Sequence, residues 1–434
     1  MKNMKNINYI NYSKLSIELT KNLSTQTKKD NGIFFTPSNT VKNNIEFLKD
    51  YFDYINNILE PSCGSGEFIT EINSIYPDKN ITGIEYNLTI FNSVKKLNND
   101  KINIIKENFL KFNPNKKYDL IIGNPPFYVM KKNEVENKYY KYFDGRPNIF
   151  ILFIIKSLEL LNKNGILSFI LPKNFLNCLY YDNTRKYINE NFNILNIIEC
   201  NDKYLETQQE TITLIIQNKN PIENNNKQFT TNINNYTIFG TIENINKINN
   251  LYQNSKTLNQ LGFKVSVGPI VWNQYKDSLF DEETYNKILA KNQNQNKKLF
   301  NTRLIYCSDI NNNKLEFKTY KNPEKKNFIN KKGNNDICLV INRGYGVGEY
   351  NFNYCLIDVD FDYLIENHLV CINYNTAENQ EKNLKKNELL KMYDMVINSL
   401  KDKRTKEFIK LYFSNNAINT TEISGILPIY QVLN

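Results

Sequence analysis

Several features that define common classes of protein are missing from this sequence of 434 residues. It contains no apolar run of about 18 residues, so we expect no membrane span. Its first residues, Met-Lys-Asn-Met-Lys-Asn, form no apolar signal region, which argues against secretion. The only histidine is His368, which argues against a hydrolase of the Ser-His or Cys-His type and favours a structural or surface role for that residue.

Cysteine is also used in a way that excludes two kinds of site. The seven cysteines are odd in number and include no Cys-x-x-Cys pair, so they indicate neither a zinc site nor a disulfide framework. We interpret them as scattered thiols in a reducing compartment, and we expect an intracellular protein without a metal centre. They lie at Cys63, Cys178, Cys200, Cys307, Cys338, Cys355 and Cys371.

The positive charge of the chain is large but is weak evidence by itself. The formal net charge is +10, which is compatible with a polyanionic partner. However, arginine supplies only five of the 55 basic residues, while Asn, Lys, Ile and Tyr are abundant throughout. Since an A+T-rich coding sequence would produce the same bias, part of this charge reflects composition.

The pattern of apolar runs predicts an α/β domain with a mostly parallel sheet, after a polar arm at 1–30. Amphipathic stretches at 66–75 and 148–161 predict helices between the strands. An Asn-rich stretch with a proline, 218–235, is the expected linker, so the domain spans 31–235. The candidate strands are 57–60, 80–85, 102–106, 118–122, 165–171, 195–200 and 211–217.

A different pattern begins at about residue 245 and continues to 434. Short strand-like pieces alternate there with loops rich in Asn and Lys, at 263–267, 304–306, 337–342 and 369–373. Apolar positions between 385 and 413 have helical spacing. We therefore expect a second, mixed α/β domain over 245–434 that ends in a helical tail.

The most informative motif is Asn124-Pro125-Pro126-Phe127, directly after the apolar strand candidate. The two prolines fix φ and lack N–H groups, so loop carbonyls can turn one way without losing ladder hydrogen bonds. The Asn124 side chain and the Pro125 carbonyl offer two acceptors, which match the two hydrogens of an amino group, and Phe127 offers a stacking face. The motif favours a slot for a planar base with an exocyclic amine. An ordinary strand-to-loop exit is the alternative.

A second motif, residues 58–69, predicts a strand, a glycine turn and the start of a helix. Gly64 and Gly66 permit positive φ, and the free N–H groups of the helix can receive a carboxylate or phosphate. Glu85, nineteen residues past Gly66, ends the next strand and can accept both ribose hydroxyls. This spacing alone does not separate NAD from S-adenosylmethionine. The carboxylate of Glu60 before the turn suits an ammonium group better than a pyrophosphate, and a turn without ligand is the alternative.

Asn108 and Phe109 follow the third strand candidate. The amide of Asn108 could bond an adenine edge while Phe109 packs against the ring. The alternative is a loop residue beside a core residue.

Together these motifs resemble those of the gamma-class N6-adenine DNA methyltransferases, in the family's order. They correspond to motifs X, I, II, III and IV, namely Gly32-Ile33-Phe34-Phe35-Thr36-Pro37, residues 60–68, Gly83-Ile84-Glu85, Asn108-Phe109-Leu110 and residues 123–127. The resemblance implies a Rossmann-like class I S-adenosylmethionine-dependent methyltransferase domain and a C-terminal DNA-recognition domain. It implies methyl transfer to the N6 amine of a flipped-out adenine in duplex DNA.

The resemblance also implies roles for individual residues. Asn124, Pro125, Pro126 and Phe127 would hold the target base, with Tyr204 as a second aromatic beside it. One departure concerns position 108, which is usually Asp in the family, so the hydrogen bond to the adenine of the cofactor changes. The residues that would bind S-adenosylmethionine are Thr36, Pro37, Glu60, Cys63, Gly64, Gly66, Glu85, Asn108 and Phe109.

In the second domain, the resemblance makes Trp272 and Arg343 candidate DNA contacts, although core packing and a surface ion pair explain them equally well. We expect a monomer that acts on double-stranded DNA, without a membrane, with a cognate restriction endonuclease encoded separately if one exists. The alternatives are an rRNA or protein glutamine methyltransferase with the same Asn-Pro-Pro-Phe slot, and a catalytically inactive DNA-binding relative.

Overall fold

The computed structural model describes residues 11–430 except 206, 208, 221–222, 292–299, 344–351, 376–383 and 414–417. The chain divides into two compact units, Met1–Asn246 and Lys247–Asn434, which are described separately below. In the described part, no helix has the length and apolarity needed to cross a bilayer.

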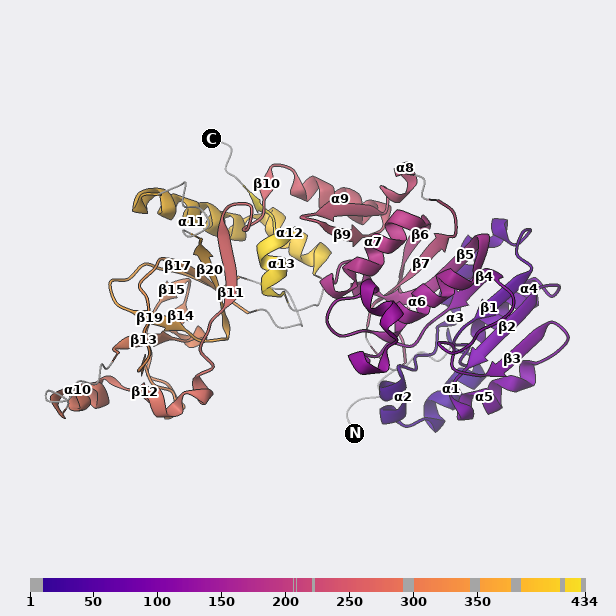
Figure 1. Ribbon diagram of the computed structural model, residues 1–434, viewed down its shortest axis with the longest axis horizontal. Coiled ribbons are helices and arrows are strands. Elements are labelled where there is room, and N and C mark those ends of the chain that lie inside the picture. Colours follow the sequence, from indigo (N-terminus) through magenta and orange to yellow (C-terminus); the bar gives the residue numbers. More distant parts are fainter. Residues whose placement is uncertain are drawn as a thin grey trace. The chain divides into compact units, whose positions relative to one another are not determined.

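Unit 1 is built on a seven-stranded sheet with the order β3-β2-β1-β4-β5-β7-β6 (Figure 1). β1 to β5 run parallel, and β7 runs antiparallel to both of its neighbours. All seven strands coincide with the candidates from the sequence to within a few residues. The strands are β1 Asn57–Glu60, β2 Asn80–Glu85, β3 Ile102–Lys106, β4 Tyr118–Gly123, β5 Leu161–Pro172, β6 Asn193–Cys200 and β7 Thr211–Gln217.

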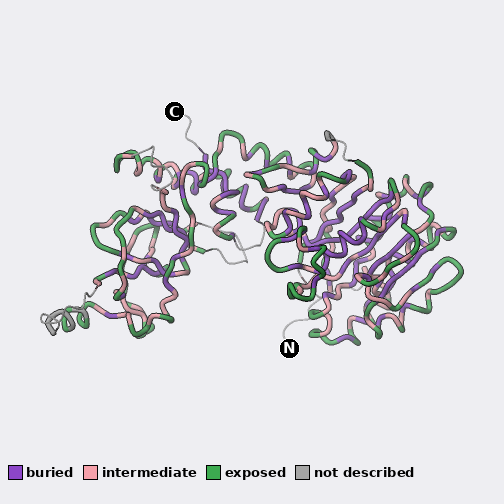
Figure 2. The backbone as a smooth tube through the Cα atoms, in the orientation of Figure 1, coloured by how far each residue is buried: buried purple, intermediate pink, exposed green. Residues whose placement is uncertain are grey.

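Helices cover both faces of this sheet because successive strand side chains point to opposite sides. In β4, Leu120 and Ile122 pack with α3, α4 and α5, whereas Ile121 packs with α6 and α7. Figure 2 shows that the buried stretches follow the strands. α6 is buried along most of its length, as expected for a helix that is apolar on all sides. The helices are α3 Ser38–Phe47, α4 Glu67–Ile75, α5 Leu88–Val94, α6 Ile149–Leu160 and α7 Asp182–Asn191.

The N-terminal arm forms two helices, α1 Lys14–Asn22 and α2 Thr25–Asn31. Ser13 and Ser24 cap them, each by accepting a main-chain N–H. Ser13 also donates a 2.7 Å hydrogen bond to the carboxylate of Glu67, the first residue of α4. The arm is therefore tied to the glycine turn that precedes α4.

After β7, the chain forms α8 Glu223–Asn226 and a hairpin of β8 Thr230–Ile233 and β9 Tyr236–Phe239. These elements occupy the stretch from which we expected a linker. The hairpin turns at Asn234 and Asn235, whose positive φ angles asparagine tolerates better than most residues. The boundary between the units falls later, within α9 Ile242–Tyr252.

Unit 2 contains two four-stranded sheets and a group of helices. The first sheet has the order β11-β20-β17-β18, with β11 Phe263–Val267, β20 Leu369–Tyr374, β17 Cys338–Asn342 and β18 Tyr354–Ile357. The second sheet has the order β12-β16-β13-β19, with β12 Leu279–Phe280, β16 Phe328–Ile329, β13 Thr302–Ile305 and β19 Tyr363–Ile365. The other described elements are α10 Glu282–Lys291, α11 Lys386–Lys401, α12 Lys403–Tyr412, α13 Thr420–Gly425, β10 Ser255–Lys256, β14 Ile310–Asn311, β15 Lys314–Leu315 and β21 Ile429–Tyr430.

The expected helical tail is thus broken in two. Asp402 has extended backbone angles and accepts the N–H of Arg404, so it ends α11 and caps α12. An interruption of this kind leaves the apolar spacing intact, which is why the sequence pattern suggested one helix.

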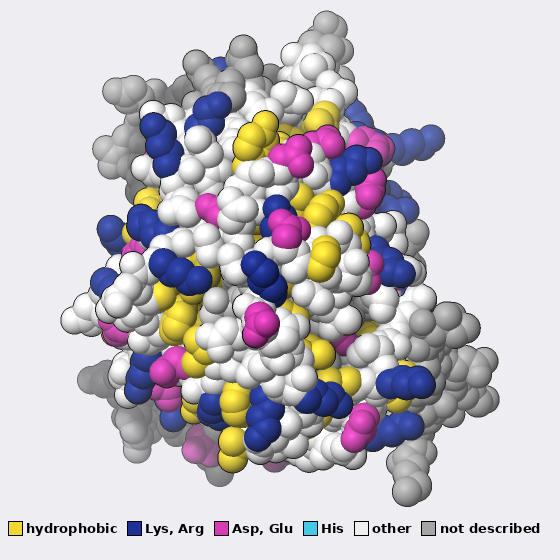
Figure 3. All heavy atoms as spheres, turned by 90° about the vertical axis from the view of Figure 1, so that its right-hand side faces the viewer, with side chains coloured by type: hydrophobic (Ala, Val, Ile, Leu, Met, Phe, Trp, Pro, Cys, Tyr) yellow, Lys and Arg dark blue, Asp and Glu magenta, His cyan; other side chains and the backbone are white. Residues whose placement is uncertain are grey.

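The distribution of charge on the surface agrees with a basic composition rather than with one basic patch, and the thiols are unpaired. The face drawn in Figure 3 carries Lys and Arg scattered among acidic and uncharged side chains rather than gathered in one patch. All seven cysteines are free, as predicted.

Candidate functional site

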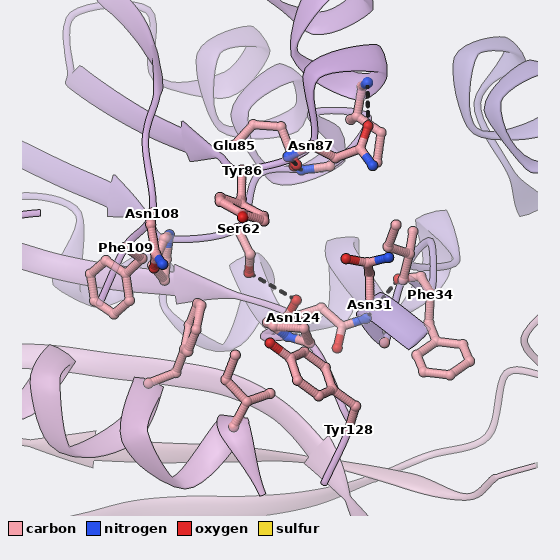
Figure 4. Close-up of a pocket in the computed structure, with 18 of the residues that line it drawn as sticks. Asn31, Phe34, Ser62, Glu85, Tyr86, Asn87, Asn108, Phe109, Asn124 and Tyr128 are labelled. Atoms are coloured by element: carbon pink, nitrogen blue, oxygen red, sulfur yellow. Dashed lines mark hydrogen bonds between the residues drawn. The ribbon is translucent and has the colours of Figure 1, made fainter. Parts of the chain in front are cut away.

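A pocket opens in unit 1 at the carboxyl ends of β1, β2 and β4 (Figure 4). This is where ligands bind in open α/β sheets. The structure brings six of the predicted site residues to its lining: Gly64, Glu85, Asn108, Phe109, Asn124 and Pro126. The lining residues that the sequence reasoning did not assign to a site include Asn31, Ser62, Tyr86, Asn87, Tyr128 and Phe153.

The glycine turn brings the backbone close to the carboxylate of Glu85. Gly64 and Gly66 have φ of 51° and 81°, in the left-handed region that favours glycine. The N–H of Gly64 donates to a carboxylate oxygen of Glu85 at 3.0 Å, and the N–H of Asn87 donates to the other at 2.6 Å. Because both oxygens are anchored by main-chain donors, the Glu85 side chain is held in one orientation at the pocket.

Burial changes the acidity of the two carboxyl groups at the strand ends. It raises the pKa of Glu85 to about 7, although the main-chain donors and Lys106 oppose the shift. It also raises the pKa of Glu60, where nearby Glu67 and Glu85 add to the effect. Glu60 is 3% exposed and one of its oxygens has no hydrogen-bond partner. A buried carboxyl group with a bare oxygen fits a ligand that brings a positive charge.

The part of the pocket near Asn108 is aromatic. Phe109 is buried, and its ring centroid lies 4.8 Å from that of Phe153, which comes from α6. Tyr86 extends into the same cavity from the end of β2. Oδ1 of Asn108 accepts the N–H of Leu110 at 3.0 Å, so a hydrogen bond from this oxygen to an adenine would need its second lone pair.

The amide of Asn124 is oriented by the segment that contains motif X. Its Nδ2 donates to the carbonyl of Phe34 and to the hydroxyl of Thr36, both at 3.1 Å. Its Oδ1 is buried and has no hydrogen-bond partner. The hydroxyl of Ser62 donates to the Asn124 main-chain carbonyl at 3.1 Å, as Figure 4 shows. Since both amide hydrogens are used, the orientation leaves one acceptor, Oδ1, available for a ligand.

Phe127 packs differently from the expectation of an open stacking face. Its ring stacks on Phe34 at 5.8 Å and meets Phe150 edge-on at 6.1 Å. The aromatic side chain that this loop presents to the pocket is Tyr128, one residue later. Two consecutive aromatic residues follow the prolines, so the sequence did not decide which of them faces the cavity.

Gly32 permits the close contact between these two segments. It ends α2 with φ of 59°, and its carbonyl accepts the N–H of Phe127 at 3.4 Å. A Cβ added to Gly32 would lie 2.5 Å from the main-chain nitrogen of Phe127. The approach therefore requires glycine for both its conformation and its lack of a side chain.

The other predicted residues do not form the described pocket wall. Thr36, Pro37, Glu60, Cys63 and Pro125 are buried and are not among the lining residues. Burial and the neighbouring Glu60 raise the pKa of the Cys63 thiol. Gly66 is the N-cap of α4, where a Cβ would meet Leu97 at 2.8 Å.

Three predicted residues lie elsewhere. Tyr204 is 7% exposed in the segment between β6 and β7, and burial raises its pKa. In unit 2, Trp272 packs in an apolar cluster with Lys325 5.4 Å from its ring. Arg343 is exposed, and its N–H donates to the carbonyl of His368 at 3.3 Å.

Comparison with known proteins confirms a resemblance to DNA methyltransferases of restriction-modification systems. Residues 5–205 match the family model of the Eco57I restriction-modification methylase. The type II methyltransferase M.CvrRI of Paramecium bursaria Chlorella virus XZ-6E is 27% identical over 427 residues, which cover 96% of this chain and 98% of M.CvrRI. The modification methylase CviBIII of Paramecium bursaria Chlorella virus NC1A is 32% identical over 218 residues, which cover 49% of this chain and 56% of that relative.

The solved structures agree on the fold. The cryo-EM structure of a DrdV–DNA complex matches 96% of this chain and 57% of DrdV, with a TM-score of 0.51 and 14% identity, a likeness that concerns the fold alone. Unit 1 thus has the class I S-adenosylmethionine-dependent methyltransferase fold, and S-adenosylmethionine is its cofactor. The residues present are compatible with it, because the Glu85 carboxylate lines the pocket and Glu60, behind the lining, keeps one buried oxygen without a hydrogen-bond partner.

The first prediction concerns the close contact between Gly32, in motif X, and Phe127, in the Asn-Pro-Pro-Phe segment. Gly32→Ala should lower both the melting temperature and the affinity for S-adenosylhomocysteine. The left-handed backbone alone costs an alanine roughly 1–2 kcal/mol, and the Cβ would press on Phe127. Differential scanning fluorimetry and calorimetric titration measure the two effects. Gly425→Ala is the control, since the atom nearest to its added Cβ is 3.8 Å away. Wild-type values for Gly32→Ala would contradict the contact.

The second prediction concerns pH. Ribose hydroxyls are best accepted by an ionised Glu85, whose pKa in the free chain is about 7. Binding of S-adenosylhomocysteine should therefore tighten as pH rises from 6 to 8, when the carboxyl group loses its proton. Calorimetric titration across this range should show weaker and flatter binding for Glu85→Gln. Glu159→Gln, on the exposed side of α6, should keep the wild-type profile, and an equally steep profile in Glu85→Gln would refute the assignment.

Proposed function

We propose that this chain, a DNA methyltransferase of the restriction-modification type, transfers the methyl group of S-adenosylmethionine to the N6 amine of an adenine flipped out of duplex DNA. The observation that carries the proposal is the unpartnered, buried Oδ1 of Asn124, held in the pocket by two hydrogen bonds to its Nδ2. An acceptor that the fold buries without a partner costs about 1–3 kcal/mol, which a ligand's hydrogen would recover.

The chemistry needs orientation more than a strong base. The lone pair of an adenine amine is delocalised into the ring, so the nitrogen is a poor nucleophile in its planar form. Oδ1 of Asn124 and the carbonyl of Pro125 would each accept one amine hydrogen and draw the nitrogen toward tetrahedral geometry. When bound, S-adenosylmethionine supplies a methyl group on a positively charged sulfur. The methylated nitrogen then releases its extra proton to water. Since this step needs no strong base, catalysis depends on the preorganised acceptors.

The same site argues against methylation of a ring carbon. That reaction on cytosine proceeds through attack by a cysteine thiolate, whereas the thiol beside this pocket, Cys63, is buried with a raised pKa. An exocyclic amine is thus the group that the site suits. Flipping such a base out of a duplex costs a few kcal/mol, which stacking on Tyr128 or on Phe127 would offset.

We assign target recognition to unit 2, with Trp272 and Arg343 as candidate contacts. Tyr204 as a second aromatic at the base, the monomeric state and a separately encoded endonuclease stay predictions. Methylome sequencing of a methylation-free host that expresses the chain tests the assignment as a whole. A recurring motif with N6-methyladenine supports it, and N4-methylcytosine or modification of RNA alone would overturn it.

The third prediction tests the slot directly. Asn124→Ala should lower the rate of methyl transfer at least about 100-fold, because it removes a preorganised acceptor from the reacting nitrogen. Its affinity for S-adenosylhomocysteine should stay within a few-fold of wild type. Transfer of tritiated methyl groups and calorimetric titration measure the two quantities. Asn92→Ala, on the exposed surface of α5, is the matched control, and near-normal turnover of Asn124→Ala would reject the role of the slot.

The fourth prediction separates two roles for Thr36. If its hydroxyl orients the Asn124 amide, Thr36→Val should lower kcat about tenfold, the value of one hydrogen bond of about 1.4 kcal/mol, and leave cofactor affinity unchanged. Thr36→Ser keeps the hydroxyl and should restore most of the rate. Loss of cofactor affinity at unchanged kcat would instead show that Thr36 serves the cofactor.

A further inference from the structure

The segment after the slot, residues 128–148, forms an excursion whose two ends are fastened together. Val129 and Asn148 form an antiparallel β-bridge. The N–H of Met130 donates to the Pro147 carbonyl at 2.9 Å, and the N–H of Ile149 donates to the Tyr128 carbonyl at 3.0 Å. We call residues 128–148 the slot-flanking loop. Its base is therefore anchored beside the pocket that Tyr128 and Met130 line.

A second hollow lies on the slot-flanking loop itself. It is lined by Val129, Met130, Lys131, Lys132, Gly145, Arg146 and Pro147. Met130 lines both this hollow and the cofactor pocket, so one side chain forms a wall between them. A nucleotide whose base entered the slot would bring its sugar-phosphate backbone to the rim where this hollow opens.

The charge of the hollow is positive. Its ionisable lining residues are Lys131, Lys132 and Arg146, all exposed, and no carboxylate lines it among the described residues. The nearby carboxylates have other partners. Glu134 accepts the N–H of Lys131, and Asp144 accepts a hydrogen bond from Asn183. The cations thus face solvent without a direct carboxylate partner in the hollow.

Arg146 differs from three other arginines of the chain, whose side chains are packed or paired. Arg185 is buried beside Asp182, Arg404 binds Asp402, and Arg303 stacks on Phe317. No ion pair of Arg146 is found among the described residues. An exposed guanidinium with its donors available suits the bidentate recognition of a phosphate.

Apolar groups stand next to these cations. Tyr180 is 57% exposed and Val129 is 56% exposed. The ring of Tyr180 lies against Gly145, where an added Cβ would be 3.0 Å from a ring carbon. Exposed aromatic surface beside basic side chains is typical of surfaces that bind nucleic-acid strands.

We propose that the slot-flanking loop binds the phosphodiester backbone of the DNA strand that carries the target base, with Lys131, Lys132 and Arg146 as the phosphate ligands. The inference rests on the proposed function. Phosphate contacts position a strand without reading its sequence, so this site would hold the strand while the base occupies the slot. It would act in unit 1 whatever sequence unit 2 selects.

The test compares two triple variants of the full chain. Lys131→Gln/Lys132→Gln/Arg146→Gln removes the proposed ligands. Lys101→Gln/Lys116→Gln/Lys117→Gln removes three exposed lysines just before the amino ends of β3 and β4. These lysines lie at the ends of the strands opposite the pocket. Both variants lose the same charge, so a difference between them reports position rather than net charge. Equal melting temperatures and equal affinity for S-adenosylhomocysteine show that both remain folded.

Binding to a duplex that carries the mapped target site is measured by fluorescence anisotropy at several salt concentrations. For the loop variant we expect the slope of log Kd against log salt to fall by about 2–3, because each lost phosphate contact removes about 0.9. We also expect KM for DNA to rise at least tenfold while kcat at saturating DNA changes less than threefold. Arg146→Lys, which keeps the charge, should retain part of the affinity.

The outcomes distinguish this inference from the proposed function. A wild-type chain that methylates adenine while both triple variants share its salt slope would overturn the inference alone. A wild-type chain that modifies no adenine while only the loop variant loses duplex binding would overturn the proposed function and support the loop. Competition by single-stranded RNA as strong as that by duplex DNA would also overturn the inference.

Discussion

The site depends on the orientation of one amide. The Phe34 carbonyl and the Thr36 hydroxyl accept both hydrogens of the Asn124 amide, so the side chain cannot turn over without losing two hydrogen bonds. Its oxygen is thereby held, buried and unpartnered, where a ligand can donate to it. This arrangement costs stability in the free protein, and under the proposed function a ligand with an amine hydrogen would relieve that cost.

The same balance applies at the cofactor end of the pocket. The fold buries Glu60 and Glu85 at the ends of adjacent parallel strands and raises the pKa of both groups. A protein selected for stability alone would avoid burying two carboxyl groups at the ends of adjacent strands. Under the proposed function, a positively charged, ribose-containing ligand would offset the cost of burying them.

The slot is joined directly to the loop that we propose as a DNA contact. The loop after Phe127 returns to α6 by way of residues 128–148, and its backbone is bonded to the segment before α6. α6 in turn supplies Phe153 to the wall of the pocket. One continuous stretch of chain thus carries Asn124, a basic hollow and an aromatic part of the pocket wall. Unit 2 folds separately around its own sheets.

The amino-acid sequence alone determined the strands of unit 1, the glycine turn and the placement of Glu85 and Asn124 at strand ends. It could do so because alternating apolar residues, glycines and prolines act locally on the backbone. Only the tertiary structure decided that Tyr128 rather than Phe127 lines the pocket, that Thr36 binds Asn124, and that Tyr86 and Phe153 join the wall. Those outcomes depend on which side chains meet across segments far apart in the chain, and local pattern carries no information about such contacts.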